Sequence, residues 1–549
     1  MAPLTLILQR SAPSSVLVLL ARVWLVAQIC VLAGCGAASG TPAGASDSGT
    51  QKAPVDSATV RNHSIPRAAF GPLYGSGCPG HGACGCGSAT GSAEEFNCQL
   101  DHLVENDIPI SAYLFDGNSW SLGSFGNANT CSGAEFCSWG LGDQVIERLT
   151  GQDVRAFLHW WGGCHADEQY DRAASRLRGR LLGFYLDDGS SDDDVRQVSE
   201  FMESVLPGDW ENVAKAFQNS EPSTTSAGLR EWSNAAYVGD LSYDFWGLKA
   251  AVTRVLARAS DIPAPFAEFT GYAYLDPGIP EETVYYRRLH FGALQPVMAH
   301  TPFANCDPWR AEYGPDLLPA YRYWAWLHRE LAPYFHSYAE LMSEDPTKPV
   351  LQQGPSSYSF LVGREIFVPL VTEPVDAMDI VLPSGDWIDY WDETRVVSGR
   401  LSGFAVPLGR EPVFIRQGAL IPLDVVRDYT GHGTEESGGS LTLLVYPSGA
   451  SSFRYRPFDA GPWITFDSSL SGSELTLRAD PGLPNQPILY RVSRWHEEPR
   501  SLVIDGATVR VNQGGFALRL GSEVAVNASH EGAWYYDSQA RRLVIKVVP

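Results

Sequence analysis

The feature that most constrains this fold is an alternation of short apolar strands with amphipathic helices between about residues 66 and 300. Eight segments read as strands: Phe70–Tyr74, Ile110–Phe115, Arg155–Trp160, Leu181–Leu186, a weaker one at 212–218, Ala235–Val238, Pro265–Phe269 and Leu294–Ala299. Several of the segments between them have apolar residues at the spacing of an amphipathic helix. Eight strands alternating with helices predict an α/β fold, specifically a (β/α)8 barrel.

The pattern changes after about residue 350. Helical periods give way to short alternating strands between Gly, Pro and Asp turns, which predicts C-terminal β-sandwich domains. A Gly-rich stretch at 430–439 reads as a loop or linker. The predicted organisation is a signal peptide at 1–35, a linker at 36–65, the barrel at 66–345, a proximal sandwich at 346–425 and a distal sandwich at 426–549.

The N-terminal segment is predicted to direct export. Arg10 and Arg22 precede an apolar stretch, Val23–Gly34, that is short for a membrane span. It ends in Leu-Ala-Gly-Cys35, which resembles a bacterial lipobox in which Cys35 is acylated. The alternative is an ordinary signal peptide with an incidental cysteine. We therefore expect a lipid-anchored protein of the bacterial cell envelope, periplasmic or at the cell surface, or a secreted one.

Cysteine content and charge narrow the function classes. Of ten cysteines, eight remain after Cys30 and Cys35, and an even number in an exported chain predicts disulfides. A zinc site is the alternative, but the usual C-x-x-C spacing is absent, and we expect neither metal nor cofactor. The net charge of −23 argues against nucleic acid as a partner and against a peripheral protein held on anionic lipid. Nothing in the sequence specifies an oligomeric state.

Three aspartates stand at predicted strand ends: Asp116, Asp187 and Asp240. In a barrel these ends converge on one mouth, where active sites are built. Two carboxylates about 5–5.5 Å apart are what a retaining glycosidase needs, one to attack the sugar and one to protonate the leaving oxygen. Aromatic residues beside these ends, including Trp160 and Tyr237, can stack on sugar rings. The alternative for each aspartate is a cap for the following helix.

Several longer stretches resemble glycoside hydrolase family 31, the retaining α-glucosidase and α-xylosidase clan. The resemblance is most specific between about residues 280 and 425 and looser in the barrel's first half. The stretches that carry it are Arg287–His300, Leu331–Phe335, Tyr358–Val371, Leu382–Trp391, Pro412–Pro422, Phe184–Asp187 and Tyr237–Asp240.

The resemblance implies a role for each matching residue. Asp187 corresponds to the nucleophile and Asp240 to the acid/base. Asp116 and His300 correspond to residues that contact the sugar at the cleavage subsite, and Tyr272 to an aromatic residue lining it. Glu268 departs from the family, which has Asp there.

The implied function is a retaining α-glycoside hydrolase that acts on α-linked oligosaccharides through a covalent glycosyl-enzyme. Two alternatives stay open: an α-transglycosidase, and a non-catalytic carbohydrate-binding protein on a decayed barrel.

Overall fold

In the computed structural model, the structure describes residues 64–75, 93–115, 143–161, 177, 179–187, 200, 203–204, 213–218, 233–239, 241–270, 280–300, 307–459 and 461–549. The chain divides into two units, Met1–Thr59 and Val60–Pro549. All described residues belong to the second unit.

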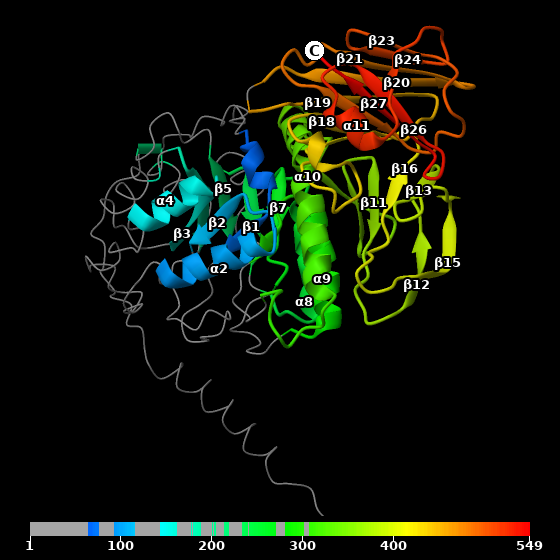
Figure 1. Ribbon diagram of the computed structural model, residues 1–549. Helices are drawn as coiled ribbons and strands as arrows, with labels where there is room; N and C mark the ends of the chain where they lie inside the picture. Colours follow the sequence, from blue (N-terminus) through cyan, green and yellow to red (C-terminus); the bar gives the residue numbers. More distant parts are fainter. Residues whose placement is uncertain are drawn as a thin grey trace, which may run out of the picture. The chain divides into compact units, whose positions relative to one another are not determined.

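Eight parallel strands form the predicted barrel (Figure 1). They are β1 (Leu73–Gly75), β2 (Ala112–Phe115), β3 (Arg155–Trp161), β4 (Leu181–Asp187), β5 (Ala214–Gln218), β6 (Ala235–Tyr237), β7 (Ala264–Phe266) and β8 (Ala299–His300). Consecutive strands pair from β1 to β7, and β8 pairs with β1. A parallel bridge between Glu268 and Ala299 joins the chain after β7 to β8, so the sheet is nearly closed. The predicted fold class is confirmed.

Helices flank the barrel strands along the chain. They are η1 (Arg67–Phe70), α2 (Ala93–Glu105), α4 (Asp143–Gly151), α8 (Phe245–Arg258), α9 (Glu282–Leu294) and α10 (Leu317–Glu344). The start of α8 has a clear local cause, because the Asp244 side chain accepts a hydrogen bond from Gly247 N–H at 2.7 Å. Leu248, Val252 and Val255 form its buried stripe, as the helical period of the sequence requires.

Two predicted strand boundaries were wrong. The segment predicted as the last strand, Leu294–Ala299, begins with the final residue of α9, and only Ala299 continues into β8. Every residue of α9 from Val284 to Leu294 is buried. A helix buried all round has no polar face, and its apolar end cannot be distinguished from a strand by periodicity. The first predicted strand also began early, because Arg67–Phe70 is a 3-10 helix.

The barrel strands carry several small residues that are completely buried. Ala112, Ala156, Ala216 and Ala236 are buried completely. At Gly183 of β4, a Cβ atom would lie 2.0 Å from the Ala214 carbonyl oxygen. The pairing of β4 with β5 therefore requires glycine at that position.

The proximal sandwich consists of a six-stranded and a two-stranded sheet, ordered β14-β13-β16-β11-β10-β9 and β12-β15. Its strands are β9 (Leu351–Gln353), β10 (Ser359–Val362), β11 (Ile366–Pro369), β12 (Ala377–Val381), β13 (Trp387–Asp389), β14 (Val396–Val397), β15 (Arg400–Ala405) and β16 (Phe414–Arg416). Phe367, Trp387 and Phe414 pack with Ile380 and Leu382 between the two sheets.

The distal sandwich pairs a six-stranded sheet, β17-β18-β22-β27-β26-β25, with a five-stranded one, β19-β20-β21-β24-β23. Its strands are β17 (Leu420–Leu423), β18 (Leu441–Val445), β19 (Ala450–Tyr455), β20 (Ile464–Ser471), β21 (Glu474–Asp480), β22 (Ile488–Val492), β23 (Leu502–Asp505), β24 (Thr508–Val511), β25 (Leu518–Arg519), β26 (Ala533–Asp537) and β27 (Arg542–Val547). Two short helices, η4 (Glu435–Ser437) and α11 (Glu523–Ala528), complete it. β17 pairs with β18 although it falls in the range predicted for the proximal domain.

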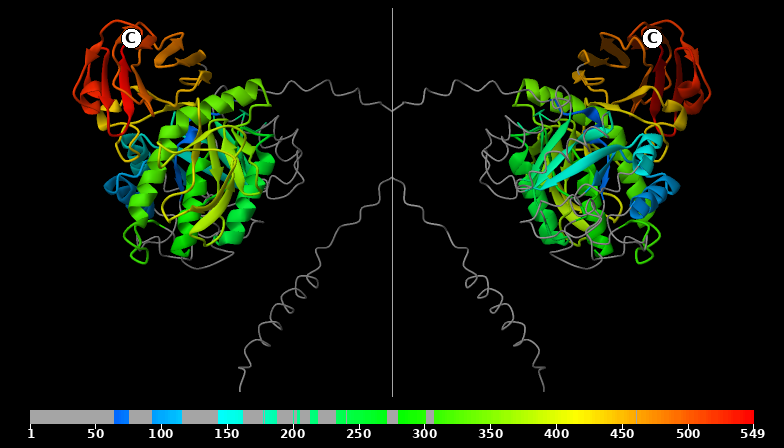
Figure 2. Two further views of the ribbon diagram at one scale, coloured as in Figure 1. Left: turned by 90° about the vertical axis from the view of Figure 1, so that its right-hand side faces the viewer. Right: turned by 90° about the vertical axis from the view of Figure 1, so that its left-hand side faces the viewer.

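Helix α10 packs on α9 and on β17 and β19 of the distal sandwich, and its Tyr334 donates a hydrogen bond to Glu365, next to β11 of the proximal one (Figure 1 and Figure 2). Its Glu330 accepts hydrogen bonds from the Thr430 hydroxyl at 2.8 Å and bonds the His432 ring at 3.0 Å. The Gly-rich stretch predicted as a loop or linker is thus tied to this helix by side-chain hydrogen bonds.

A buried ion cluster joins α9 to the proximal sandwich. Both oxygens of Glu411 are used: Oε2 contacts Arg287 at 3.4 Å and the His290 ring at 2.8 Å, and Oε1 accepts from Val371 N–H at 2.5 Å. All three side chains of the cluster are buried. A buried carboxylate with this many partners fixes the orientation of the two domains, because losing any partner leaves a charge out of water.

Candidate active site

The predicted site residues fall at the C-terminal ends of the barrel strands, as far as the structure describes them. Asp187 is the last residue of β4, Trp160 lies one residue before the end of β3, Tyr237 ends β6 and His300 ends β8. Asp116, Asp240 and Tyr272 lie outside the described residues, as does Cys35. Asp116 directly follows β2, and Asp240 follows β6 by three residues. The positions fixed by the backbone therefore agree with a site at one mouth of the barrel.

Strand register places Asp187 near the level of Tyr237. Trp161 pairs with Asp187 across β3 and β4. Leu186 pairs with Phe217, and Gln218 pairs with Tyr237. Only β5 separates β4 from β6, so two spacings of about 4.8 Å put these strands roughly 10 Å apart. The last residues of β4 and β6 therefore stand on the same edge of the barrel.

The chain directly before Asp240 is held by two hydrogen bonds. Before it, Val238 N–H donates to the Phe266 carbonyl at 3.0 Å, and its carbonyl accepts from Arg254 at 3.2 Å. Gly239 has φ of 93°, a left-handed conformation that favours glycine. The backbone that delivers Asp240 therefore turns sharply at a position where a side chain would be strained.

A buried arginine that sequence reasoning missed holds the loops after β6 and β7 together. Arg288 of α9 is 2% exposed. Its Nη1 donates to the carbonyls of Ser242 at 2.9 Å and Asp244 at 3.2 Å, and its Nε donates to the Phe269 carbonyl. One planar guanidinium thus joins two catalytic-face loops by its fixed fork of donors.

The charge of the same guanidinium helps to lower the pKa of the Asp244 carboxyl. Partial burial raises the pKa of the Asp244 carboxyl, but hydrogen bonds from the Ser242 hydroxyl and Gly247 N–H, with the charge of Arg288, outweigh it and leave the pKa below its usual value. Asp244 is therefore ionised at neutral pH and caps α8 as a carboxylate.

His300 is buried within an aromatic cluster at the end of β8. It is 1% exposed, stacks on Tyr74 with ring centroids 4.3 Å apart, and its Nδ1 lies 2.9 Å from the Tyr321 hydroxyl. Burial lowers the pKa of His300 to about 3. The ring is therefore neutral near pH 7 and can take part in a sugar site as a hydrogen-bonding group, without a charge.

Tyr74 and Asp307 extend the cluster beyond the sequence-predicted set. The Tyr74 hydroxyl donates to the fully buried Asp307 carboxylate, and Trp309 stacks on Tyr74 at 5.9 Å. Tyr74 lies in the first predicted strand, so the strand-end argument used for the aspartates would have found it. Asp307 had no such signal, because it stands 233 residues from its partner.

Within the ranges that the structure describes, no group of three or more His, Cys, Asp or Glu side chains could hold a metal ion. The strand ends named above carry a carboxylate, an imidazole that is neutral near pH 7 and aromatic side chains. Those are the groups that glycosyl transfer uses.

Comparisons with known proteins agree with the predicted family resemblance. Residues 333–421 match the family model described as "Glycosyl hydrolase family 31 C-terminal domain". The isomaltosyltransferase of Sporosarcina globispora is 23% identical over 371 residues, which cover 61% of this chain and 31% of that protein. The chain thus spans about a third of the length of this relative.

Solved structures resemble the chain over most of its length. The cycloalternan-forming enzyme from Listeria monocytogenes, in complex with a pentasaccharide substrate, superposes with a TM-score of 0.67 at 17% identity, covering 88% of this chain and 53% of that one. The GH31 dextranase of Flavobacterium johnsoniae, complexed with glucose, gives 0.66 at 15% identity, covering 88% and 70%. The family resemblance is confirmed for the C-terminal domain by sequence, and these structures confirm the fold.

Proposed function

We propose that this chain is a retaining α-glycoside hydrolase of the family 31 type, acting on α-linked oligosaccharides. The observation that carries the proposal is the position of Asp187 at the end of β4, one strand away from the β6 end that Asp240 follows, in a barrel joined to a family 31 C-terminal domain. The relatives' names, isomaltosyltransferase and dextranase among them, support α-glucosides as the substrate class.

The proposed reaction has two displacements. Asp187 attacks the anomeric carbon while Asp240 gives its proton to the departing glycosidic oxygen, which leaves a glycosyl ester on Asp187. Asp240, now ionised, takes a proton from water as the water oxygen attacks the same carbon, and the ester bond to Asp187 breaks. Two inversions return the sugar in its original α configuration. His300 would donate or accept a hydrogen bond with a sugar hydroxyl as a neutral ring.

A transglycosidase differs only in the acceptor of the second step. The names of two relatives, isomaltosyltransferase and 1,6-alpha-glucosyltransferase, favour this second candidate. Trp246 is relevant to it, because it lies in the first turn of α8, shortly after Asp240, and its side chain is 80% exposed. An exposed indole near the mouth is a suitable platform for an acceptor sugar.

The test is to trap the glycosyl-enzyme and identify its ester. The chain is incubated with a 5-fluoro-α-glucosyl fluoride, and intact mass and peptide mapping follow. We expect one adduct on Asp187, and proton NMR of a turnover reaction should show the α anomer first. Asp240→Ala should lose activity on unactivated α-glucosides, keep activity on α-glucosyl fluoride, and recover in part with azide. An adduct on another carboxylate, or release of the β anomer, would show that the roles are misassigned.

Export and anchoring form a separate proposal. We infer that Cys35 is acylated and holds the mature chain on a bacterial envelope membrane. No helix of the described residues is long and apolar enough to cross a membrane. Cys98 is disulfide-bonded, which supports folding in an oxidising compartment. Metabolic labelling with palmitate should mark the wild type and not Cys35→Ser; equal labelling of both would contradict the lipobox.

A further inference from the structure

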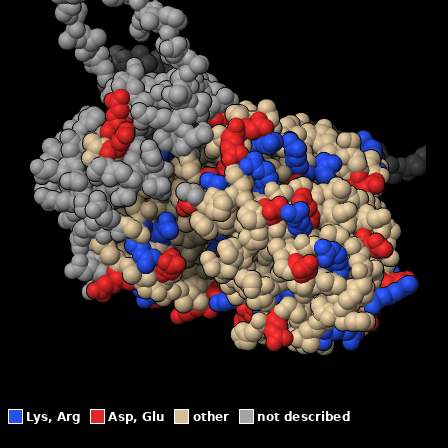
Figure 3. All heavy atoms as spheres, turned by 90° about the horizontal axis from the view of Figure 1, so that it is seen from above, with Lys and Arg blue, Asp and Glu red and all other residues tan. Residues whose placement is uncertain are grey.

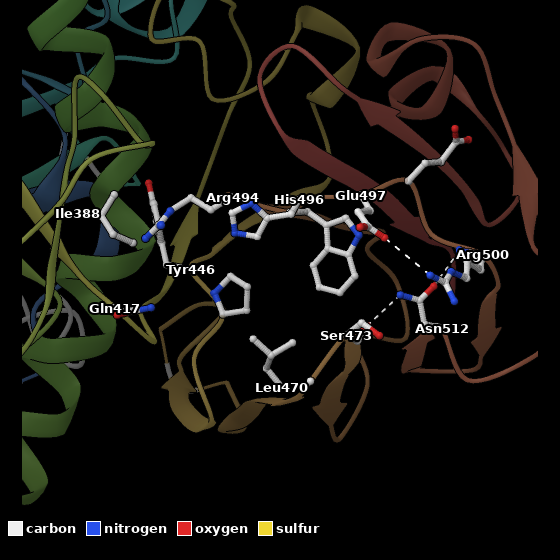
Figure 4. A pocket seen from close by; sticks show the side chains of 14 residues that line it. Ile388, Gln417, Tyr446, Leu470, Ser473, Arg494, His496, Glu497, Arg500 and Asn512 are labelled. Atoms are coloured by element: carbon white, nitrogen blue, oxygen red, sulfur yellow. Dashed lines mark hydrogen bonds and ion pairs between the residues drawn. The ribbon is translucent and has the colours of Figure 1, made fainter.

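A cavity of about 370 Å³ lies among the C-terminal β-sandwiches, on domains other than the barrel (Figure 4). Its walls come from the end of β13, the turn between β20 and β21, and the segment after β22. The volume is within the range of about 300–1,000 Å³ that small-molecule sites occupy. The proposed catalytic chemistry does not use it.

The cavity wall is held in place by hydrogen bonds. Asn512 accepts from Arg500 N–H at 2.7 Å and donates to the Ser473 carbonyl at 2.9 Å (Figure 4). Arg494 and Asn512 both adopt left-handed backbone conformations, with φ of 59° and 60°. Such conformations persist in non-glycine residues where the surrounding structure fixes them, so the wall is preorganised.

Trp495 contributes a small part of its indole ring to the wall. The side chain is 6% exposed, and its indole N–H is buried with no hydrogen-bond partner in the described part of the chain. Its backbone is fixed at both ends, because its N–H donates to the Arg541 carbonyl at 2.8 Å and its carbonyl accepts from the Tyr536 hydroxyl at 3.1 Å. Because this N–H is buried, a ligand in the cavity would meet only the small exposed part of the ring.

Two carboxylates of the wall have basic neighbours. Glu497 lies 3.9 Å from Arg500, and Glu498 lies 2.5 Å from Arg519. Figure 3 also shows acidic and basic side chains interspersed on the described surface seen from above. The groups that remain for a ligand are the side chains of Gln417, Ser473, His496 and Arg494, beside the exposed part of the indole. Amide, hydroxyl, imidazole and guanidinium groups beside part of an aromatic ring, with carboxylates of Glu497 and Glu498 in the same wall, suit a hydroxyl-rich neutral ligand better than an anion.

We propose that this cavity is an accessory binding site for neutral oligosaccharides, separate from the barrel mouth. The choice of α-glucans as probes rests on the proposed function, but the site itself does not require catalysis. Its role would be to hold a second part of a long substrate, or a neighbouring chain of it, near the enzyme. A second binding site of this kind raises the effective concentration of the substrate near the enzyme, and so raises its affinity for long substrates without new contacts at the active site.

The test localises binding on the full-length chain. Hydrogen exchange is measured on Asp187→Asn, which prevents turnover, with and without isomaltooligosaccharides or maltooligosaccharides at up to about 10 mM, a concentration that detects even weak sites. We expect protection of residues 494–500 and of the turn around Ser473. Ser473→Trp, at an exposed turn position, should fill the cavity and abolish that protection. Ser538→Trp, at another exposed turn outside the cavity, is the matched control and should keep it.

A second variant probes the chemistry of the wall. Arg494→Asn removes the guanidinium at a left-handed position that asparagine tolerates, and should weaken binding by roughly tenfold or less because the neutral groups remain. No protection of 494–500 with either oligosaccharide series would overturn the proposal, and so would protection that survives Ser473→Trp. Protection by inorganic phosphate in place of the sugars would show an anion site and overturn it as well.

Failure of the proposed function gives a different result. A chain that hydrolyses no α-glucoside but shows the cavity protection keeps this inference and loses the catalytic one. With Asp187 intact, Ser473→Trp should retain wild-type hydrolysis of an aryl α-glucoside and lose activity selectively on long glucans.

Discussion

Acidification should destabilise the barrel through its buried histidines, and His328 allows this to be measured. Its ring is fully buried on α10. Met298 N–H donates to its Nε2 at 3.3 Å, so Nδ1 carries the proton and donates to the Ala293 carbonyl at 3.0 Å. The neutral ring satisfies both nitrogens. A protonated ring would set a second N–H against the Met298 N–H and lose that hydrogen bond.

The direction and size of the loss of stability on acidification follow from the pKa values of the two histidines. Burial lowers the pKa of His328 from 6.5 to about 4, and that of His300 from 6.5 to about 3. Between these values and 6.5 the unfolded chain binds protons that the folded chain does not, so stability is lost as the pH falls below 6.5. At about 1.4 kcal/mol per pH unit, lowering the pH from 6.5 to 5 costs about 2 kcal/mol for each ring. Burial also lowers the pKa of His290, which contributes in the same direction.

The assay is urea unfolding followed by circular dichroism at pH 7.5 and pH 5. His328→Gln keeps a donor and an acceptor but cannot titrate, so its loss of stability on acidification should be smaller than that of the wild type by about 2 kcal/mol. His530→Gln, at an exposed position, is the control and should behave like the wild type. An identical pH dependence for His328→Gln and the wild type would refute the reasoning.

Three further changes test the architecture and the site. Glu411→Gln should lower the unfolding free energy by about 3–5 kcal/mol, because it breaks a buried ion pair, whereas Glu373→Gln, which removes an exposed one, should cost about 1 kcal/mol or less in the same urea titration. Arg288→Met should lower kcat on α-glucosides by far more than its fall in melting temperature accounts for, since it frees the loops after β6 and β7. An unchanged kcat would contradict its positioning role. Gly183→Ala should prevent β4 from pairing with β5 through a clash with Ala214, and a soluble variant with native circular dichroism would show that the strands can move apart.

The barrel was predictable because its signal is local. Each strand is a short apolar run, and the amphipathic helices between such runs carry their own period, so eight strands could be counted without any knowledge of contacts. The weak candidate at 212–218 shows the limit of this reasoning, because Lys215 interrupts its apolar run and yet is fully buried in β5. A single polar residue removes the local signal of a strand whose burial is decided by its neighbours in the sheet.

Which candidate residues stand at strand ends was predictable where position along a strand determines position in space. The ends of β4 and β6 follow from the strand count, and the structure has Asp187 and Tyr237 at these ends. His300 was predicted from the family resemblance, and it ends β8. Arg288, by contrast, stands in a helix that is buried all round, where a charged residue has no local signature. Its acceptors are backbone carbonyls of loops up to 46 residues away, and carbonyls carry no sequence identity.

The same physics explains why the positioning residues were missed and why they matter. A buried guanidinium or carboxylate is tolerated only where several partners meet it, and those partners come from separate segments that fold against each other. Arg288 therefore holds two loops in a fixed relative position. Glu411 does the same for the barrel and the proximal sandwich. Catalytic carboxylates need their separation held within fractions of an ångström, and elements so tied cannot drift independently. Under the proposed function, Arg288 is the buried charge that bears on the site, because the two loops it joins follow β6 and β7.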